Sequence, residues 1–570
     1  MSSVMVLILG IGGMLVGWLV YSRFVAERIF RLDPEFVTPA HSLQDGVDFV
    51  PTNKFVLWGH HFTSVAGAAP IVGPAIAVYW GWLPAVLWVT IGTIFFAGVH
   101  DFGALWASSR HQGKSIGALS QDVIGQRTRK LFMVVIFLVL LMVNAVFGVI
   151  IASSLISTPG AVFPAWAAIA VALIMGQLLH RKIIGLGTLT LIGVGALYFS
   201  IYVGSVLPLA LPDDFLGLSA KPAWILILFA YAAVASMLPV WSLLQPRDYI
   251  NGIQLALGLL LLYGAVFVGL PDLSAPMVNT QLTADAPPIV PLLFVTIACG
   301  AVSGFHGIVA SGTSSKQLDT EPDARFVGYL GAIGEGALAL IAIVAVSGVA
   351  LAATPEEWHA LYDHFGAGGA SAFIAGGASL ISSGWGIDIE FSKTLLAVML
   401  VLFAGTTMDS GVRLQRYIIQ EWGEIYKLPL LGNNTVATLL AVAACLLIAF
   451  GAGGPTGDGG MIIWPLFGST NQILASLTLL VLSVYLHKLG RPAWVTLIPM
   501  LLVLVMAFLA ALIQLREFYE VKNYLLVAID AAVIIITVLV ILEALAALRH
   551  WNDNQHSQPG SAESRTTRSG

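Results

Sequence analysis

Long apolar runs separated by short clusters of charged residues are the feature of this sequence that most constrains its fold. Many of the runs approach about 20 residues, the length of a helix that crosses the hydrocarbon core of a membrane. Only 10% of the 570 residues are charged, whereas a typical soluble chain has about 25%. We therefore predict an all-α polytopic membrane protein and exclude a soluble enzyme, a nucleic-acid-binding protein and a disordered scaffold.

The hydrophobic pattern predicts about fifteen transmembrane helices. They cover residues 4–21, 62–79, 82–106, 131–153, 162–179, 184–208, 222–242, 252–271, 288–311, 328–352, 391–409, 433–452, 461–486, 493–514 and 524–547. The apolar segment 370–385 is too short and too rich in glycine for a span, so we predict a half-helix or a re-entrant segment. The two cysteines, Cys299 and Cys445, lie in apolar runs and indicate neither a disulfide nor a cysteine metal site.

Lysine and arginine in short loops indicate the orientation of the spans, because these residues favour the cytoplasmic side. If the N-terminus lies outside, only Lys221, Lys393, Arg516 and Lys522 of the 26 lysines and arginines fall in outer loops. The opposite orientation would reverse this bias. We therefore predict an outer N-terminus and a cytoplasmic C-terminus, with a disordered polar tail at 551–570.

Prolines at membrane depth predict that two of these spans are interrupted. The first interruption lies in GHHFTSVAGAAPIVGP, where Pro70 and Pro74 each remove a helical N–H group. The second lies in AYAAVASMLPVWSLLQP, where Pro239 does the same. Backbone groups without partners at this depth are tolerated only inside protein or beside water. Simple kinks in ordinary spans are the alternative interpretation.

Each interrupted span is the first of a group of five predicted helices. By the charge rule, the first group begins on the cytoplasmic side of the membrane and the second group begins on the outer side. This pattern is typical of a secondary transporter built from a 5+5 inverted repeat. The predicted units are an N-terminal helix and linker (1–55), a first repeat (56–208), an inverted second repeat (209–410), extra C-terminal transmembrane helices (411–550) and the tail (551–570).

Five segments of the sequence resemble the carbon starvation protein A (CstA) family. They read WGHHFTSVAGAAPIVGPAIAVYWGWLPA, FFAGVHDFGALWAS, CGAVSGFHGIVASGTSSKQL, FAGTTMDSGVRLQRYIIQEW and WPLFGSTNQILA, and they extend from Trp58 to Ala475. The resemblance implies a LeuT-type fold, related to the amino acid–polyamine–organocation superfamily, in the bacterial inner membrane with a periplasmic N-terminus. It also implies peptide uptake during carbon starvation or proton-coupled uptake of pyruvate.

The two interruptions form the predicted substrate site, because the N-terminus of a half-helix offers free N–H groups and the positive end of a dipole to a carboxylate. Neither interrupted span contains an acidic residue for the ammonium group of a peptide, which favours a monocarboxylate. Trp241 could instead belong to the membrane interface. The predicted substrate-binding residues are Gly67, Ala68, Pro70, Gly73, Ser236, Pro239, Trp241 and Ser303.

Titratable residues in or beside apolar spans are the predicted carriers of a coupling proton. The candidates are His306, Glu335, His60, His61 and Asp101. A sodium site is the alternative, and its candidate residues are Ala66, Ser311 and Thr313. In place of a bound sodium ion, Lys316 could supply a fixed positive charge there. The sequence shows no carboxylate beside this group, so we predict proton symport, with no metal site and no cofactor.

These features predict a transporter and no enzyme activity. The sequence around Gly113, Lys114 and Ser115 has Ser108 where a phosphate-binding loop needs glycine, and the zinc motif H-E-x-x-H is absent. We expect uptake of pyruvate or a related small carboxylate, and di- or tripeptides are the alternative substrates. A channel and a membrane sensor remain as other classes. The expected partners are the substrate and the lipid bilayer, without nucleic acid, and the oligomeric state stays open.

Overall fold

The computed structural model describes residues 2–46, 48–212, 214–239, 241–282 and 286–556, and within these ranges it contains helices and no β-strand. Thirteen continuous helical stretches in this part of the chain are long and apolar enough to cross a membrane, or fourteen if a bent pair counts as one span. The protein is therefore an all-α, multi-pass membrane protein, as the sequence predicts.

The helices of the continuous spans are α1 (Ser3–Val16), α6 (Trp82–Gly92), α7 (Gly98–Arg110), α9 (Gln126–Ser157), α10 (Val162–His180), α11 (Leu186–Val206), α12 (Ala220–Met237), α13 (Leu244–Gly269), α16 (Leu330–Ser347), α19 (Ile389–Ile425), α20 (Asn434–Gly451), α22 (Trp464–Lys488), α23 (Trp494–Glu520) and α24 (Tyr524–His556). Here α6 and α7 belong to one span, and α2 (Ser22–Phe24) prolongs α1. The shorter helices are α3 (Pro39–Ser42), α4 (Lys54–Val65), α5 (Ala69–Ala77), α8 (Ile116–Val123), α14 (Ile289–Thr296), α15 (Gly304–Gly312), α17 (Pro355–Leu361), α18 (Ala370–Trp385) and α21 (Gly459–Ile462).

Short polar residues start several helices by accepting hydrogen bonds from the free N–H groups of the first turn. The Asn53 side chain accepts from Phe55 N at the start of α4, and Asp388 accepts from Phe391 N at the start of α19. The predicted half-helix at 370–385 forms α18 with the predicted bounds, and α19 follows it closely.

The first predicted interruption is confirmed. The axes of α4 and of the helical stretch that begins with α5 differ by 53°, and Ala66, Gly67 and Ala68 lie between the two helices. The carbonyl of Ala68 accepts hydrogen bonds from the N–H groups of Ile71 and Val72, which starts α5. Pro70 occupies the first turn of α5, where its missing N–H costs nothing.

The second predicted interruption, at Pro239, is wrong. Helix α12 ends at Met237 and α13 begins at Leu244, so Pro239 follows a helix end and does not interrupt a span. Pro239 has no N–H to donate to the carbonyl of Ala235, which ends the helix. Instead, Nη2 of Arg413 on α19 donates to Ala235 O at 3.2 Å and to Leu238 O at 2.7 Å.

The predicted continuous span 288–311 is also wrong, because two short helices, α14 and α15, occupy this region. The residues between them, 297–303, have no regular structure. Gly300, within this segment, has φ +90°, a left-handed conformation that other residues rarely adopt. The second interrupted helix of this protein is therefore α14–α15. This interruption accounts for the difference between fifteen predicted spans and fourteen, and the number falls to thirteen when the bent pair α4–α5 is not counted as a span.

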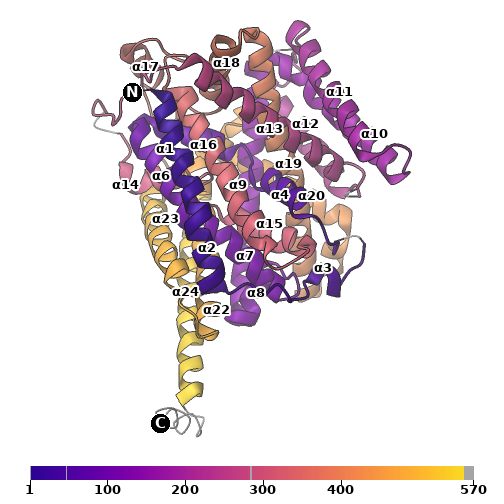
Figure 1. The fold of residues 1–570 in the computed structure, drawn as a ribbon, viewed down its shortest axis with the longest axis vertical. Helices are drawn as coiled ribbons and strands as arrows, with labels where there is room; N and C mark the ends of the chain where they lie inside the picture. The colour runs from indigo at the N-terminus through magenta and orange to yellow at the C-terminus, as the bar shows by residue number, and fades with distance from the viewer. Residues whose placement is uncertain (1, 47, 213, 240, 283–285, 557–570) are drawn as a thin grey trace.

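The long helices α9 and α19 pack against each other in the interior, while α1 lies along the outside against α6 and α16 (Figure 1). The hairpin of α10 and α11 lies at one edge, and the start of α1 and the end of α24 lie at opposite ends of the molecule. In the most apolar part of α22, 94% of the residues are buried, against 28% in α24. Polar residues of α22 therefore face protein and not lipid.

Replacement of Gly73 by alanine should destabilise the fold. A Cβ atom at Gly73 would lie 2.3 Å from the backbone oxygen of Thr296, so α5 and α14 would have to separate. We expect a loss of about 1–3 kcal/mol, typical of overpacking, measured as the fraction of detergent-purified protein that stays monodisperse after heating. The control is Gly405→Ala in α19, where a Cβ meets nothing within 4 Å and should stabilise by about 0.5–1 kcal/mol. Equal stability of the two variants would contradict the contact between α5 and α14.

Candidate functional site

A small cavity lies where the two interrupted helices meet. Its lining comes from the bend between α4 and α5, from the segment between α14 and α15 with the start of α15, and from α9, α19 and α22: Val65, Gly67, Ala69, Val143, Phe147, Cys299, Phe305, Thr407 and Phe467. A Cβ atom at Gly67 would lie 2.8 Å from the ring of Phe147 and 3.0 Å from Oγ1 of Thr407. Glycine at this position therefore keeps the space open.

The cavity combines apolar walls with the N-termini of two nine-residue helices. Helix α5 begins at Ala69 and α15 begins at Gly304, and Ala69 and Phe305 both line the cavity. Helix N-termini carry a partial positive charge and free N–H groups, which suit an anion. None of the described residues that line the cavity has a charged side chain. In this conformation the cavity, with a volume of about 10 Å³, has room for no more than about one water molecule, so a larger anionic ligand needs a more open conformation.

A buried imidazole between two carboxylates lies next to the cavity. In His306 on α15, Nδ1 lies 2.8 Å from Oδ2 of Asp101 on α7, and Nε2 lies 2.9 Å from Oε2 of Glu335 on α16. Asp101 also contacts Nδ1 of His100 at 2.7 Å. All four side chains are at most 1% exposed. Because charges buried at this depth must compensate one another, the protonation states of Asp101, His306 and Glu335 are coupled.

Glu335 is the least satisfied member of this group. The contact between His306 Nε2 and Glu335 Oε2 is short but does not have the geometry of a hydrogen bond, and neither oxygen of Glu335 has a hydrogen-bond partner among the described residues. Asp101, by contrast, has an imidazole on each oxygen. Protonation would turn Glu335 into a donor, so it is the member best placed to take up a proton.

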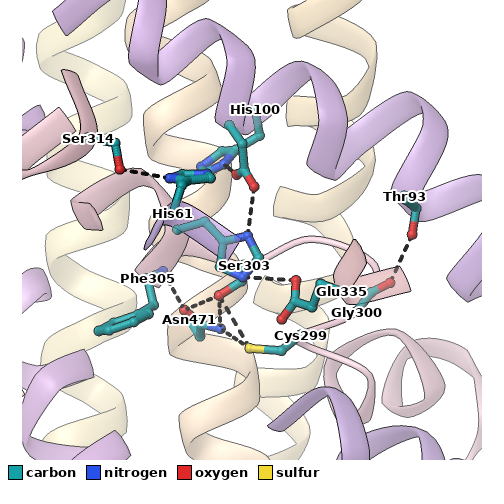
Figure 2. Close-up of polar contacts among 12 residues, drawn as sticks. His61, Thr93, His100, Cys299, Gly300, Ser303, Phe305, Ser314, Glu335 and Asn471 are labelled. Atoms are coloured by element: carbon teal, nitrogen blue, oxygen red, sulfur yellow. Dashed lines mark hydrogen bonds and ion pairs between the residues drawn. The ribbon is translucent and has the colours of Figure 1, made fainter. Parts of the chain in front are cut away.

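The segment 297–303 connects the cavity with this group (Figure 2). Cys299 lines the cavity, and its Sγ lies within 4.8 Å of ligand atoms of His306 and Glu335. Nδ2 of Asn471 on α22 donates to Ser303 Oγ at 3.0 Å, and Asn471 Oδ1 accepts from Phe305 N at 3.0 Å. Any movement of this segment therefore affects both the cavity and the group formed by Asp101, His306 and Glu335.

Thr93 fixes the same segment from the other side, since its Oγ1 donates to the carbonyl of Gly300 at 3.0 Å. Figure 2 shows Thr93 and Asn471 on opposite sides of the segment. The break between α14 and α15 is thus held by side chains from two other spans. Such partners replace the helical hydrogen bonds that the break removes.

Among the described residues, one set of donor atoms lies close enough together to bind a metal ion. It comes from Cys299, His306 and Glu335. These ligand types suit zinc, which has metal–nitrogen and metal–oxygen distances of about 2.0–2.2 Å. Two donors on one tetrahedral ion are then roughly 3.3 Å apart, whereas His306 Nε2 and Glu335 Oε2 are 2.9 Å apart. The two donor atoms are therefore closer together than a bridging ion would hold them, and they contact each other directly.

The structure brings together only some of the predicted substrate residues. Gly67 lines the cavity, Ala68 and Pro70 belong to the same bend, Gly73 packs on α14, and Ser303 lies in the second interruption. The other three, Ser236, Pro239 and Trp241, are not among the lining residues. The hydroxyl of Ser236 donates to Ala233 O at 2.9 Å in its own helix, and Trp241 stacks on His180 at 4.1 Å between ring centroids.

Of the predicted proton carriers, Asp101, His306 and Glu335 form one group, and His61 of α4 lies at its edge. Nδ1 of His61 lies 2.9 Å from Ser314 Oγ, while Nε2 has no partner among the described residues (Figure 2). Nε2 of His60 also lacks a partner in the described part of the chain.

The residues considered for a sodium site have other partners. Oγ of Ser311 donates to Gly307 O at 2.6 Å and accepts from Ile116 N at 2.8 Å. Thr313 ends α15, and Lys316 lies 3.7 Å from Asp48. Ala66 lies in the bend after α4. The structure therefore gives no common oxygen cage to these four residues.

The sequence interpretation missed Cys299, Asn471 and Thr407. Cys299 was treated as an apolar residue, and Asn471 lies in a span outside the predicted repeats. The signal that could have found Cys299 is the string CGAVSG, in which small residues and two glycines predict a break as well as a proline does, whereas no local signal points to Asn471 or Thr407.

Comparison with known proteins identifies the family of this chain. The family described as "Carbon starvation protein CstA" matches residues 2–510. The chain is 34% identical to the "Peptide transporter CstA" of Campylobacter jejuni, over 89% of this chain and 79% of that protein. It is 32% identical to the "Pyruvate/proton symporter BtsT" of Escherichia coli, over 87% and 80%. It is 29% identical to the "Peptide transporter CstA" of Bacillus subtilis, over 97% of each. This chain belongs to the carbon starvation protein CstA family.

Proposed function

We propose that this protein is a secondary transporter of the bacterial inner membrane that takes up pyruvate or a related small carboxylate together with a proton during carbon starvation. One observation carries the proposal: the segment 297–303 borders the cavity through Cys299 and adjoins His306 and Glu335. A cavity and a titratable group that adjoin the same junction between two helices can be occupied together, as symport requires. The relatives that are named as transporters support transport rather than catalysis.

The fold proposed for this activity is a LeuT-type inverted repeat with extra helices. The interrupted helices α4–α5 and α14–α15 support it, because by the charge rule they cross the membrane in opposite directions. The unit boundaries, with a second repeat that begins at residue 209, stay a prediction.

Protonation and substrate binding act on the same helix in the proposed cycle. A proton on Glu335 changes its contact with His306, and His306 lies two residues after Gly304, where α15 begins. The N-terminus of α15 borders the cavity, where a carboxylate would accept hydrogen bonds. Both ligands therefore favour one position of α15, and each increases the affinity for the other.

Peptide uptake is the second candidate, and the names of several relatives favour it. A peptide carries an ammonium group that needs an acceptor, and the cavity offers no carboxylate among its described lining residues. The coupling ion also stays a proposal: the partners of Ser311 and Lys316 favour a proton over sodium.

The substrate can be determined with purified protein in proteoliposomes. Uptake of labelled pyruvate should saturate and should be inhibited by lactate and other small 2-oxo or hydroxy acids, because the helix N-termini at the cavity suit a carboxylate. Gly67→Val should abolish uptake, since the new side chain would occupy space beside Phe147 and Thr407. The control is Gly59→Val, where a Cβ meets nothing within 4 Å. Inhibition by tripeptides but not by lactate would favour the peptide transporter.

Coupling can be tested with Glu335→Gln, which keeps the size of the side chain but cannot exchange a proton. We expect exchange of labelled for unlabelled substrate to continue and uphill uptake driven by a pH gradient to stop. His306→Gln should also lose uphill uptake. If both variants retain it, the coupling site lies elsewhere, with His60 and His61 as the next candidates. Uptake that depends on sodium at fixed pH, without alkalinisation outside, would contradict proton symport.

The orientation can be tested by single cysteines in a variant without Cys299 and Cys445. Cysteines at Thr280 and His359 should react with an impermeant reagent from the periplasm, and those at Gln112 and Tyr426 only from the cytoplasm. We expect this because the charge rule places the N-terminus outside. Reversed reactivity at any two of the four positions would contradict the proposed orientation.

A further inference from the structure

A second buried group of charged side chains lies apart from Glu335. Arg247, near the start of α13, forms an ion pair with Asp409 of α19. Tyr231 of α12 accepts from Arg247 Nη1 at 2.8 Å and donates to Asp409 Oδ2 at 2.9 Å. Nη2 of Arg247 lies 3.3 Å from Asp248 Oδ1. Arg247 is 2% exposed and Asp409 is 0% exposed. Ionisable residues inside transmembrane segments are costly and are functional candidates for that reason.

The contact surface between α13 and α19 continues this group along one face of α13. Arg247, Asn251, Gln254 and Gly258 are spaced as residues on one helix face are. Asn251 Nδ2 donates to Oγ1 of Thr406 on α19 at 3.0 Å. At the far end, a Cβ atom at Gly258 would lie 2.7 Å from the sulfur of Met399 on α19. We call this surface the α13–α19 seam.

Several buried polar atoms in the seam have no hydrogen-bond partner among the described residues: Arg247 Nε, Asn251 Oδ1, Gln254 Nε2 and Oε1, and Asp409 Oδ1. Buried polar atoms are almost always paired, because each unpaired one costs about 1–3 kcal/mol. A purely structural contact between transmembrane helices would therefore be apolar here. The polar lining is expected if the seam contains water in another conformation of the protein.

The seam reaches the cavity. Thr407, which lines the cavity and faces Gly67, directly follows Thr406 in the seam. Helix α13 also packs on α4, where a Cβ at Gly252 would lie 2.7 Å from Oγ1 of Thr63. From Thr407 the seam leads toward Arg247, at the end of α13 that the charge rule places in the cytoplasm.

We propose that the α13–α19 seam is the route by which the substrate leaves the cavity for the cytoplasm. The Arg247–Asp409 pair closes this route, and Arg247 binds the carboxylate of the substrate when the pair opens. The substrate carboxylate has the same chemistry as the side chain of Asp409 and would take its place on the guanidinium, which binds carboxylates in bidentate geometry. The inference rests on the proposed transport of a small carboxylate.

The route can be tested without any assumption about the substrate. In the variant without Cys299 and Cys445, cysteine replaces Asn251 or Gln254, and inside-out vesicles are treated with a negatively charged, impermeant thiosulfonate reagent. We expect both positions to react, and to react at least several-fold faster after Asp409→Asn. The control is Leu260→Cys on the lipid-facing side of α13, where the native residue is 69% exposed and the cysteine should not react. No reaction at either seam position, with or without Asp409→Asn, would overturn the route.

The role of Arg247 can be tested by measuring pyruvate transport from each side of the membrane. Arg247→Gln should raise KM for pyruvate on the cytoplasmic side by about ten-fold or more, which corresponds to a lost charge-assisted hydrogen bond, and should leave KM on the periplasmic side unchanged. Arg247→Lys, which keeps the charge, should be intermediate. Equal changes on both sides, or none, would overturn binding by Arg247.

A destabilised Arg247→Gln would be replaced by the double variant Arg247→Gln/Asp409→Asn, which leaves no unpaired charge in the seam. The same one-sided rise in KM is expected for it. If pyruvate is not transported at all, the proposed function fails, whereas the cysteine reactivity of the seam still decides whether the route exists.

Discussion

Backbone groups inside a membrane need hydrogen-bond partners from the protein, and this requirement determines where the chain can leave the helical conformation. It does so at depth in two places, at Ala66–Ala68 and at residues 297–303, and both are enclosed by other spans. Thr93, Asn471 and the first turn of α5 supply the partners that a continuous helix would have supplied itself. The cavity lies where these two helices stop, and in the proposed function the same helix ends are the groups that would bind the carboxylate.

Buried charge imposes a second requirement, which the protein meets in two separate groups. Each places one cationic or potentially cationic side chain between carboxylates: His306 between Asp101 and Glu335, and Arg247 between Asp409 and Asp248. The difference lies in the central group. An imidazole can lose its proton at cellular pH, whereas a guanidinium cannot. The central residue of the first group, His306, can therefore change its charge, whereas Arg247 in the second group can change only its partner.

The sequence was sufficient for the features that depend on local pattern. The apolar runs, the bend at Pro70 and the bounds of α18 follow from hydropathy, proline and glycine, and the structure has them. The prediction at Pro239 is wrong because the local sequence does not distinguish a proline that ends a helix from one that interrupts a span. The distinction depends on Arg413, which is distant in sequence and donates to the carbonyls at that helix end. The break at 297–303 contains no proline. The meeting of Gly67 with Cys299 and Phe305 depends on tertiary packing, which no local pattern contains.

The packing of α14 has a mechanical consequence. Two neighbouring helices approach its backbone through glycine: Gly73 of α5 against the carbonyl of Thr296, and Gly468 of α22 against the carbonyl of Val295, where added Cβ atoms would lie at 2.3 and 2.2 Å. A contact between backbones contains no side chain that could change rotamer to absorb a displacement, because protein interiors are close-packed. Nε2 of Gln472 on α22 also donates to the carbonyl of Phe294 on α14. A displacement of α5 or α22 is therefore transmitted directly to α14, which ends where the segment 297–303 begins.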